Sequence, residues 1–245
     1  MDSKLALIVL FGLAASAANL AGGWFISSRP ALRRTALNAL ISLGAGFMLS
    51  AAILEVIPHS LRLSSLAGVY ILAGYLFVHL VEHTISTHFH FGEETHCDAV
   101  LRPRVAYSAL GGLALHAFFD GALIGAGLWV SARFGILMFM AVILHKIPEG
   151  FTAASIMGAS GRSRRAERTA TLIIGLSTLL GVLMSGLSEF LSRTFLPFSA
   201  GVTLYVAASD LIPEVNRESG ATVSVGVFLG VVFFLLTDRI LEWVL

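Results

Sequence analysis

The sequence predicts an all-α integral membrane protein, a bundle of eight transmembrane helices in a single domain that spans residues 1–245. Of its 245 residues, 56% are hydrophobic and only 13% are charged, whereas soluble globular domains carry roughly 25% charged residues. The 24 glycines suit a helical bundle in lipid, because small residues let neighbouring helices approach closely. These values argue against a water-soluble fold. Lipid is therefore an expected partner, and nucleic acid is not.

Eight apolar runs are separated by charged or turn residues. Backbone polar groups in hydrocarbon must be paired internally, so continuous runs of roughly 20 residues are expected to form helices that span the bilayer. The first run also has some features of a secretory signal peptide, but it continues to Ile26, which favours a transmembrane helix. The expected helices cover residues 5–26, 35–57, 65–84, 105–130, 133–158, 168–191, 196–214 and 221–243.

The positive charges predict the orientation of the chain, because cytoplasmic loops are enriched in Lys and Arg. Ten of the 16 Lys and Arg residues follow odd-numbered helices: Arg29, Arg33, Arg34, Arg102, Arg104, Arg162, Arg164, Arg165, Arg168 and Arg217. Five lie on the opposite side, namely Lys4, Arg62, Arg133, Arg193 and Arg239, and Lys146 lies inside a helix. Both termini are therefore expected outside a cell (inner) membrane that the chain crosses several times.

An internal repeat relates the ends of the second and seventh helices. Residues 46–59 align with residues 201–214, and the alignment pairs Glu55 with Asp210 and one proline with another. The two helices are separated by an odd number of crossings, so the copies would run in opposite directions through the membrane. Inverted repeats with a site at their interface are typical of transporters.

The fourth and fifth helices carry the same motif, His-x-x-x-acid-Gly. The first copy has His116 and Asp120, and the second has His145 and Glu149. Residues four apart lie on one face of a helix, so two adjacent antiparallel helices can bring these side chains together. The spacing predicts a metal site with four ligands.

The ligand types favour zinc, which binds His nitrogen and carboxylate oxygen in tetrahedral geometry. With only one cysteine in the chain, Cys97, a thiolate cage is excluded. Each charge at the bilayer centre is unfavourable by about 2.5–3.5 kcal/mol, so these residues are expected to have a function. The alternative is an internal ion-pair network in which Lys146 neutralises a carboxylate.

The two motifs, together with eight helices, outside termini and a His-rich loop after the third helix, resemble the ZIP (Zrt/Irt-like) divalent metal transporters along essentially the whole chain. This resemblance implies inverted three-helix repeats around helices four and five, and import of zinc or a related cation toward the cytoplasm. It also implies that His116, Asp120, His145 and Glu149 form the transport site.

Some members of that family have a second metal site, and here its positions are altered. The resemblance places Ala117 and Lys146 after the two histidines and assigns Glu189 as the matching glutamate of helix six. Because alanine cannot ligate and an ammonium repels cations, we expect one bound metal, with Lys146 replacing the second ion. Phe119 and Asp120 also depart from the usual proline and glutamate, which leaves metal preference open.

Other acidic and histidine residues are accessory candidates. Glu55 and Asp210 would either line the mouths of the pathway or, as we favour, be interfacial carboxylates. The expected cytoplasmic loop at residues 85–104 and the helix before it are rich in histidine, which suggests metal capture. The accessory histidines are His79, His83, His88 and His90.

The sequence therefore predicts a carrier rather than an enzyme. Its expected substrate is Zn²⁺, with Fe²⁺, Mn²⁺, Cd²⁺ and Co²⁺ as the other candidates. The alternative function is an intramembrane zinc-dependent hydrolase, in which the metal would activate water. The His-Glu-x-x-His motif of many metalloproteases is absent from the sequence. The sequence leaves both a monomer and a homodimer open.

Overall fold

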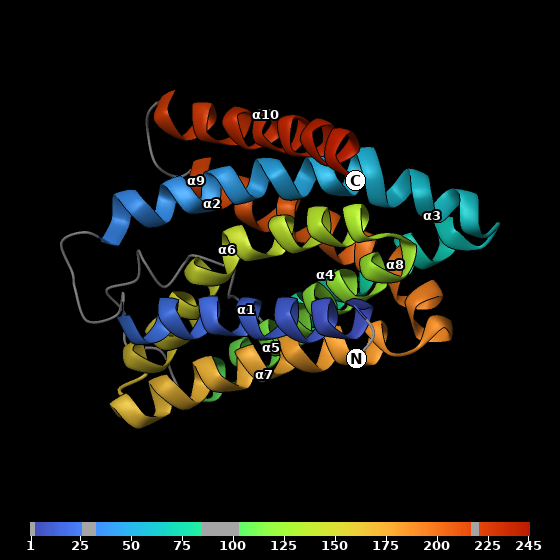
Figure 1. Ribbon diagram of the computed structural model, residues 1–245. Coiled ribbons are helices and arrows are strands. Elements are labelled where there is room, and N and C mark those ends of the chain that lie inside the picture. Colours follow the sequence, from blue (N-terminus) through green and yellow to red (C-terminus); the bar gives the residue numbers. More distant parts are fainter. Residues whose placement is uncertain (1–2, 26–32, 85–102, 217–220) are drawn as a thin grey trace.

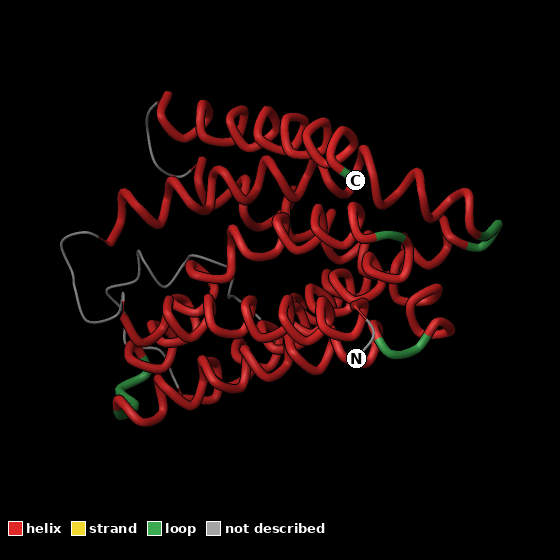
Figure 2. The backbone as a smooth tube through the Cα atoms, viewed as in Figure 1, coloured by secondary structure: helices red, strands yellow, loops and turns green. Residues whose placement is uncertain are grey.

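The computed structural model describes residues 3–25, 33–84, 103–216 and 221–245. Within these ranges every regular element is a helix, and there is no strand. The helices lie side by side in one bundle, and both chain termini lie at one end of it (Figures 1 and 2). That end also holds the turn between α5 and α6, and we call it the turn end. The elements are α1 (Ser3–Phe25), α2 (Arg33–Ser50), η3 (Ala51–Val56), α3 (Ile57–Leu63), α4 (Ala67–Thr84), α5 (Pro103–Val130), α6 (Ala132–Ala159), α7 (Arg164–Gly186), α8 (Glu189–Tyr205), η5 (Val206–Leu211), α9 (Ile212–Asn216) and α10 (Ala221–Val244).

Seven helical stretches of the described chain are long and apolar enough to cross a membrane, which fits an integral membrane bundle. The third of the eight predicted helices, residues 65–84, is present as α4 but is not among these seven. Its last turns carry His79, Glu82 and His83, and these polar side chains lower the hydropathy of an 18-residue helix. The seven stretches are Lys4–Trp24, Asn38–Leu63, Ala106–Val130, Ala132–Gly158, Arg164–Gly186, Glu189–Asn216 and Ser224–Val244.

Two of the long helices widen into π-helical segments at matching places. The segment η3 interrupts the helix that continues as α3, and η5 interrupts the helix that continues as α9. Pro58 and Pro213 each stand second in the following α-helix. Proline has no N–H to complete the helical ladder and crowds the carbonyl four residues earlier, which accounts for the wider turn before it. Glu55 and Asp210 lie within these segments.

The break between α7 and α8 lies earlier than the sequence predicted. The expected interruption was at residues 192–195, but the chain turns at Leu187 and Ser188. The Ser188 side chain accepts a hydrogen bond from the backbone N–H of Leu191 and so caps the start of α8. Glu189 therefore begins α8 and does not end the sixth predicted helix.

Helices α2 and α8 each use a glycine to approach a neighbouring helix. The carbonyl oxygen of Val227 in α10 lies where a side chain on Gly46 would sit. In the same way, the carbonyl oxygen of Ile71 in α4 occupies the place of a side chain on Gly201. Gly46 and Gly201 are partners in the sequence repeat. The pair α2 and α10 is thus packed like the pair α8 and α4.

The remaining four helices show a second set of matching contacts. Gly121 of α5 packs directly against the carbonyl of Thr178 in α7, and Gly150 of α6 packs against the carbonyl of Asn19 in α1. Gly121 and Gly150 end the two His-x-x-x-acid-Gly motifs. These close contacts connect α1, α5, α6 and α7, which we call the site group. The other helices form two glycine-packed pairs, α2 with α10 and α4 with α8. We call these two pairs, together with η3, α3, η5 and α9, the flanking group.

The largest apolar core lies between the two groups. It includes Phe47 and Met48 from α2, Leu123 from α5, Leu137 from α6 and Leu196 from α8, all of them fully buried. Apolar side chains fill much of this interface. Gly44 of α2 faces α6 across it, and a Cβ there would meet His145 and Leu144 at ordinary van der Waals distance.

We expect Gly46→Ala to lower the free energy of unfolding by about 1–3 kcal/mol, because its methyl group would overlap the Val227 carbonyl. Gly111→Ala is the matched control, since a Cβ there meets nothing within 4 Å. Alanine favours a helix over glycine by about 1 kcal/mol, so the control should be neutral or stabilising. Thermal unfolding in detergent compares the two variants, and equal melting temperatures would contradict the close packing.

Candidate metal site

The helices α5 and α6 form a hairpin that carries both motifs. A single residue, Ser131, links them, and its side chain accepts a hydrogen bond from the N–H of Phe134 at 3.1 Å. This cap starts α6 directly after α5, so the two helices run antiparallel and in contact. The hairpin fixes the relative heights of the two motifs.

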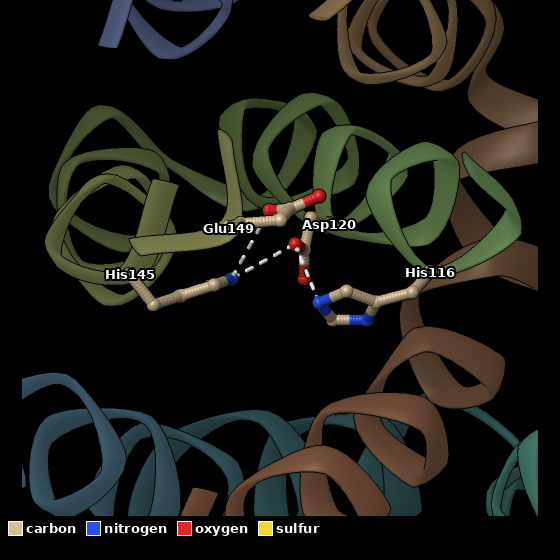
Figure 3. A group of neighbouring side chains, drawn as sticks. All are labelled: His116, Asp120, His145 and Glu149. Atoms are coloured by element: carbon tan, nitrogen blue, oxygen red, sulfur yellow. Dashed lines mark hydrogen bonds and ion pairs between the residues drawn. The ribbon is translucent and has the colours of Figure 1, made fainter. Parts of the chain in front are cut away.

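All four predicted ligands meet between these two helices (Figure 3). The Nε2 atoms of His116 and His145 lie 3.1 Å and 2.9 Å from the same Asp120 oxygen, Oδ2. Glu149 Oε2 lies 4.0 Å from His145 Nε2. None of the four side chains is more than 7% exposed.

The spacing of these atoms suits a small metal ion. One ligand atom from each residue can be chosen so that all four lie within 4.8 Å of one another. Zinc bonds of roughly 2.0–2.2 Å place tetrahedral ligand atoms roughly 3.3–3.6 Å apart. A modest contraction of the side chains would therefore complete the coordination sphere.

The backbone orients one ligand ring. His145 Nδ1 lies 3.1 Å from the carbonyl oxygen of Ala141, four residues earlier on α6. When Nδ1–H donates to this carbonyl, the neutral ring presents the lone pair of Nε2 to the cluster, as metal binding requires.

Lys146 is the cation of the site. Its side chain is fully buried, and Nζ donates to Asp120 Oδ2 at 2.8 Å and to Glu149 Oε2. The ion-pair network that the sequence left as an alternative is therefore present. It leaves candidate ligand atoms free, however, because Asp120 Oδ1 and Glu149 Oε1 are buried without a hydrogen-bond partner in the described chain. Such atoms are costly unless a polar species reaches them.

A cavity of about 50 Å³ extends from His116 away from the turn end. Its walls are mainly apolar, with Phe77 and Phe119 among them. Glu82 of α4 and Asp210 of η5 supply its acidic groups.

A larger hollow, of about 280 Å³, lies at the turn end. It is lined by His59, Trp129, Glu189 and Arg193, among others, and by none of the four ligands.

The structure places the accessory acidic candidates apart from the four ligands. Glu55 lies near the turn end, 4.0 Å from Arg133. Asp210 is 4% exposed and reaches the cavity that His116 lines. Glu189 pairs with Arg193 at 2.6 Å on the surface, whereas Lys146 pairs within the cluster.

The accessory histidines lie on or beyond the end of α4. His79 and His83 are exposed, and their rings are 4.1 Å apart. His88 and His90, with most of the loop at residues 85–104, lie outside the described residues.

Glu82 was not singled out in the sequence, where it is one of several polar residues near the His-rich loop. The signal that could have identified it is a carboxylate near the end of a mainly apolar helix. Only the folded chain brings it beside Asp210, which is far away in sequence.

Comparison with known proteins gives consistent matches. The sequence profile of the ZIP zinc transporters matches residues 92–238. The chain is 31% identical over 168 residues to zinc transporter ZIP9 of Micropogonias undulatus, covering 63% of this chain and 53% of that protein. It is 32% identical over 136 residues to zinc transporter SLC39A7 of Canis lupus familiaris, covering 49% of this chain and 29% of the relative.

A longer and weaker match, to zinc transporter zipt-7.1 of Caenorhabditis briggsae, is 25% identical over 247 residues and covers 75% of this chain and 63% of the relative. The chain spans about half the length of the ZIP9 relatives that it matches.

Proposed function

This chain belongs to the ZIP zinc transporter family, and we propose that it carries divalent metal ions, zinc above all, across a membrane through the site on α5 and α6. The observation that carries the proposal is the buried cluster of His116, Asp120, His145 and Glu149, whose ligand atoms lie within 4.8 Å of one another. Relatives that match this chain are named zinc transporters.

Eight membrane crossings, with α4 as the third, are part of this proposal. The proposed architecture has inverted repeats of three helices on either side of α5 and α6. The matching π-helical segments support it. So do the paired glycine contacts of α2 with α10 and of α8 with α4.

The turn end is proposed to face outside, as the distribution of positive charges predicts. Metal would leave toward the cytoplasm along the cavity beside His116, past Glu82 and Asp210. Exposed His79 and His83, and the loop at residues 85–104, would receive it. Neutral imidazoles and ionised carboxylates bind the metal, and protonation of the same groups favours its release.

One metal ion per chain is expected, because Lys146 occupies the space between the two carboxylates. One divalent ion and the ammonium carry three positive charges against two negative ones. A second divalent ion would raise the excess from one charge to three in a buried site, which is strongly unfavourable. Metal analysis of purified protein equilibrated with zinc should give one tightly bound ion per chain. The expectation would be contradicted if the wild type bound two zinc ions per chain and the Glu149→Gln variant bound neither of them.

Zinc influx into proteoliposomes that contain a fluorescent chelator tests the transport function. Protein-dependent influx that saturates with zinc supports it, and competition by Fe²⁺, Mn²⁺, Cd²⁺ and Co²⁺ then measures selectivity. A folded protein that passes none of these ions would refute the proposal. We do not favour the hydrolase, because the named relatives are transporters. The mass of the protein in native lipid would separate a monomer from a homodimer.

A further inference from the structure

An ion cluster near the turn end links the two groups of helices. Arg133, the second residue of α6, donates through Nη2 to Asp238 Oδ1 of α10. Its Nη1 lies 4.0 Å from Glu55 Oε1 of η3. The three side chains are partly shielded, with exposures of 32% for Arg133, 22% for Asp238 and 23% for Glu55. One guanidinium thus joins three elements that are distant in sequence.

Arg133 is held firmly to the hairpin that carries the metal site. It follows Ser131, the single residue between α5 and α6, whose side chain caps α6. The backbone N–H of the next residue, Phe134, is the group that donates to this cap. A displacement of the hairpin would therefore move Arg133 with it.

The partners of Arg133 belong to the flanking group, whereas Arg133 belongs to the site group. Within each group, glycines bring helix backbones into direct contact, as Gly150 does with α1 and Gly46 does with α10. Gly44 of α2 faces across the groups, and a Cβ there would meet α6 only at ordinary van der Waals distance. A boundary of this kind can slide more readily than the interfaces inside each group.

The ion cluster lies on the closed side of the metal site. The cavity at His116 extends toward the opposite end. On the turn-end side of the site the neighbouring buried side chains are apolar. Leu123 lies one helical turn from Asp120 and Ala141 one turn from His145, and Met48 of α2 lies one turn beyond Gly44. Access from the turn end requires these side chains to separate, and with them the hairpin from the flanking group.

We propose that Arg133, with Asp238 and Glu55, is a latch that holds the turn end of the metal site closed. This inference rests on the proposed transport function, which requires the site to open alternately to each side. Opening at the turn end would pull the guanidinium from both carboxylates. The ion cluster therefore stabilises the closed arrangement and sets the fraction of molecules that can accept metal from that end.

Distances between spin labels test the latch. Because Cys97 is the only cysteine, Cys97→Ser gives a background for labels at exposed Ala132 on α6 and Trp243 on α10. A control pair at Leu13 and Leu180 lies inside the site group, on α1 and α7, and should not change. The latch residue is changed in the variant Arg133→Gln, and the charges are exchanged in Arg133→Asp with Asp238→Arg.

In Arg133→Gln we expect the population of molecules with a longer distance between the first pair of labels to rise about two- to fivefold, the size of effect that an ion pair near the surface supports. The KM for zinc supplied at the turn end should fall by a similar factor, because a larger fraction of the molecules is open at that end and can bind zinc. The charge exchange should restore both values.

Unchanged distances and KM in Arg133→Gln would overturn the latch, as would an exchange variant that folds but restores neither. Wild-type protein that passes no metal would refute the transport function instead. The distance comparison would still decide whether Arg133 holds the two groups together.

Discussion

His145→Ala and Glu149→Gln should each reduce zinc influx by about 100-fold or more, since loss of a ligand has a larger effect than the 10- to 100-fold expected for a residue that only supports one. Both side chains are fully buried and contribute to the four-residue cluster. The measurement is the initial rate of zinc entering chelator-loaded proteoliposomes, with equal amounts of folded protein.

Glu167→Gln is a matched control for the glutamate variant. Glu167 pairs with Arg164 in the first turn of α7, away from the four-residue cluster and from the Arg133 ion cluster, and its replacement should leave influx unchanged. Zinc binding to the same variants by calorimetry provides a second measurement. If His145→Ala transports zinc at the wild-type rate, the site on α5 and α6 is not the transport site.

Lys146→Met should destabilise the metal-free protein by about 3–5 kcal/mol, the usual result of removing one partner from a buried ion pair. Asp120 and Glu149 would keep their negative charges without the ammonium that now contacts both. Zinc should recover much of this loss, because it supplies positive charge to the same oxygens. The stabilisation by zinc should therefore be larger in the variant than in the wild type.

Thermal unfolding with and without zinc measures this difference. Lys4→Met is the control, since Lys4 lies over the Trp129 ring at the far end of α1 and makes no ion pair with the cluster. A Lys146→Met protein as stable as the wild type without metal would show that the ammonium is not the counter-ion of the site.

Several features of the fold were predictable from local pattern. Apolar length located the helices, because a helix satisfies its own backbone in lipid. Helical spacing placed His116 with Asp120 and His145 with Glu149 on their helix faces. In the structure the side chains of these four residues lie together. The predicted break at residues 192–195 was wrong, because the cap at Ser188 decided where α8 begins and hydropathy carries no such signal.

What the sequence by itself determined was a helical membrane protein with two pairs of His and carboxylate residues on helix faces, since these depend on composition and on the period of one helix. Tertiary structure alone decided the partners of the charges. Lys146 lies between Asp120 and Glu149, Glu189 pairs on the surface with Arg193, and Arg133 reaches Asp238 across the two groups of helices. The physical reason is that charge pairing acts over a few ångströms in space, and those distances are set by glycine contacts and helix packing between segments that are far apart in the chain.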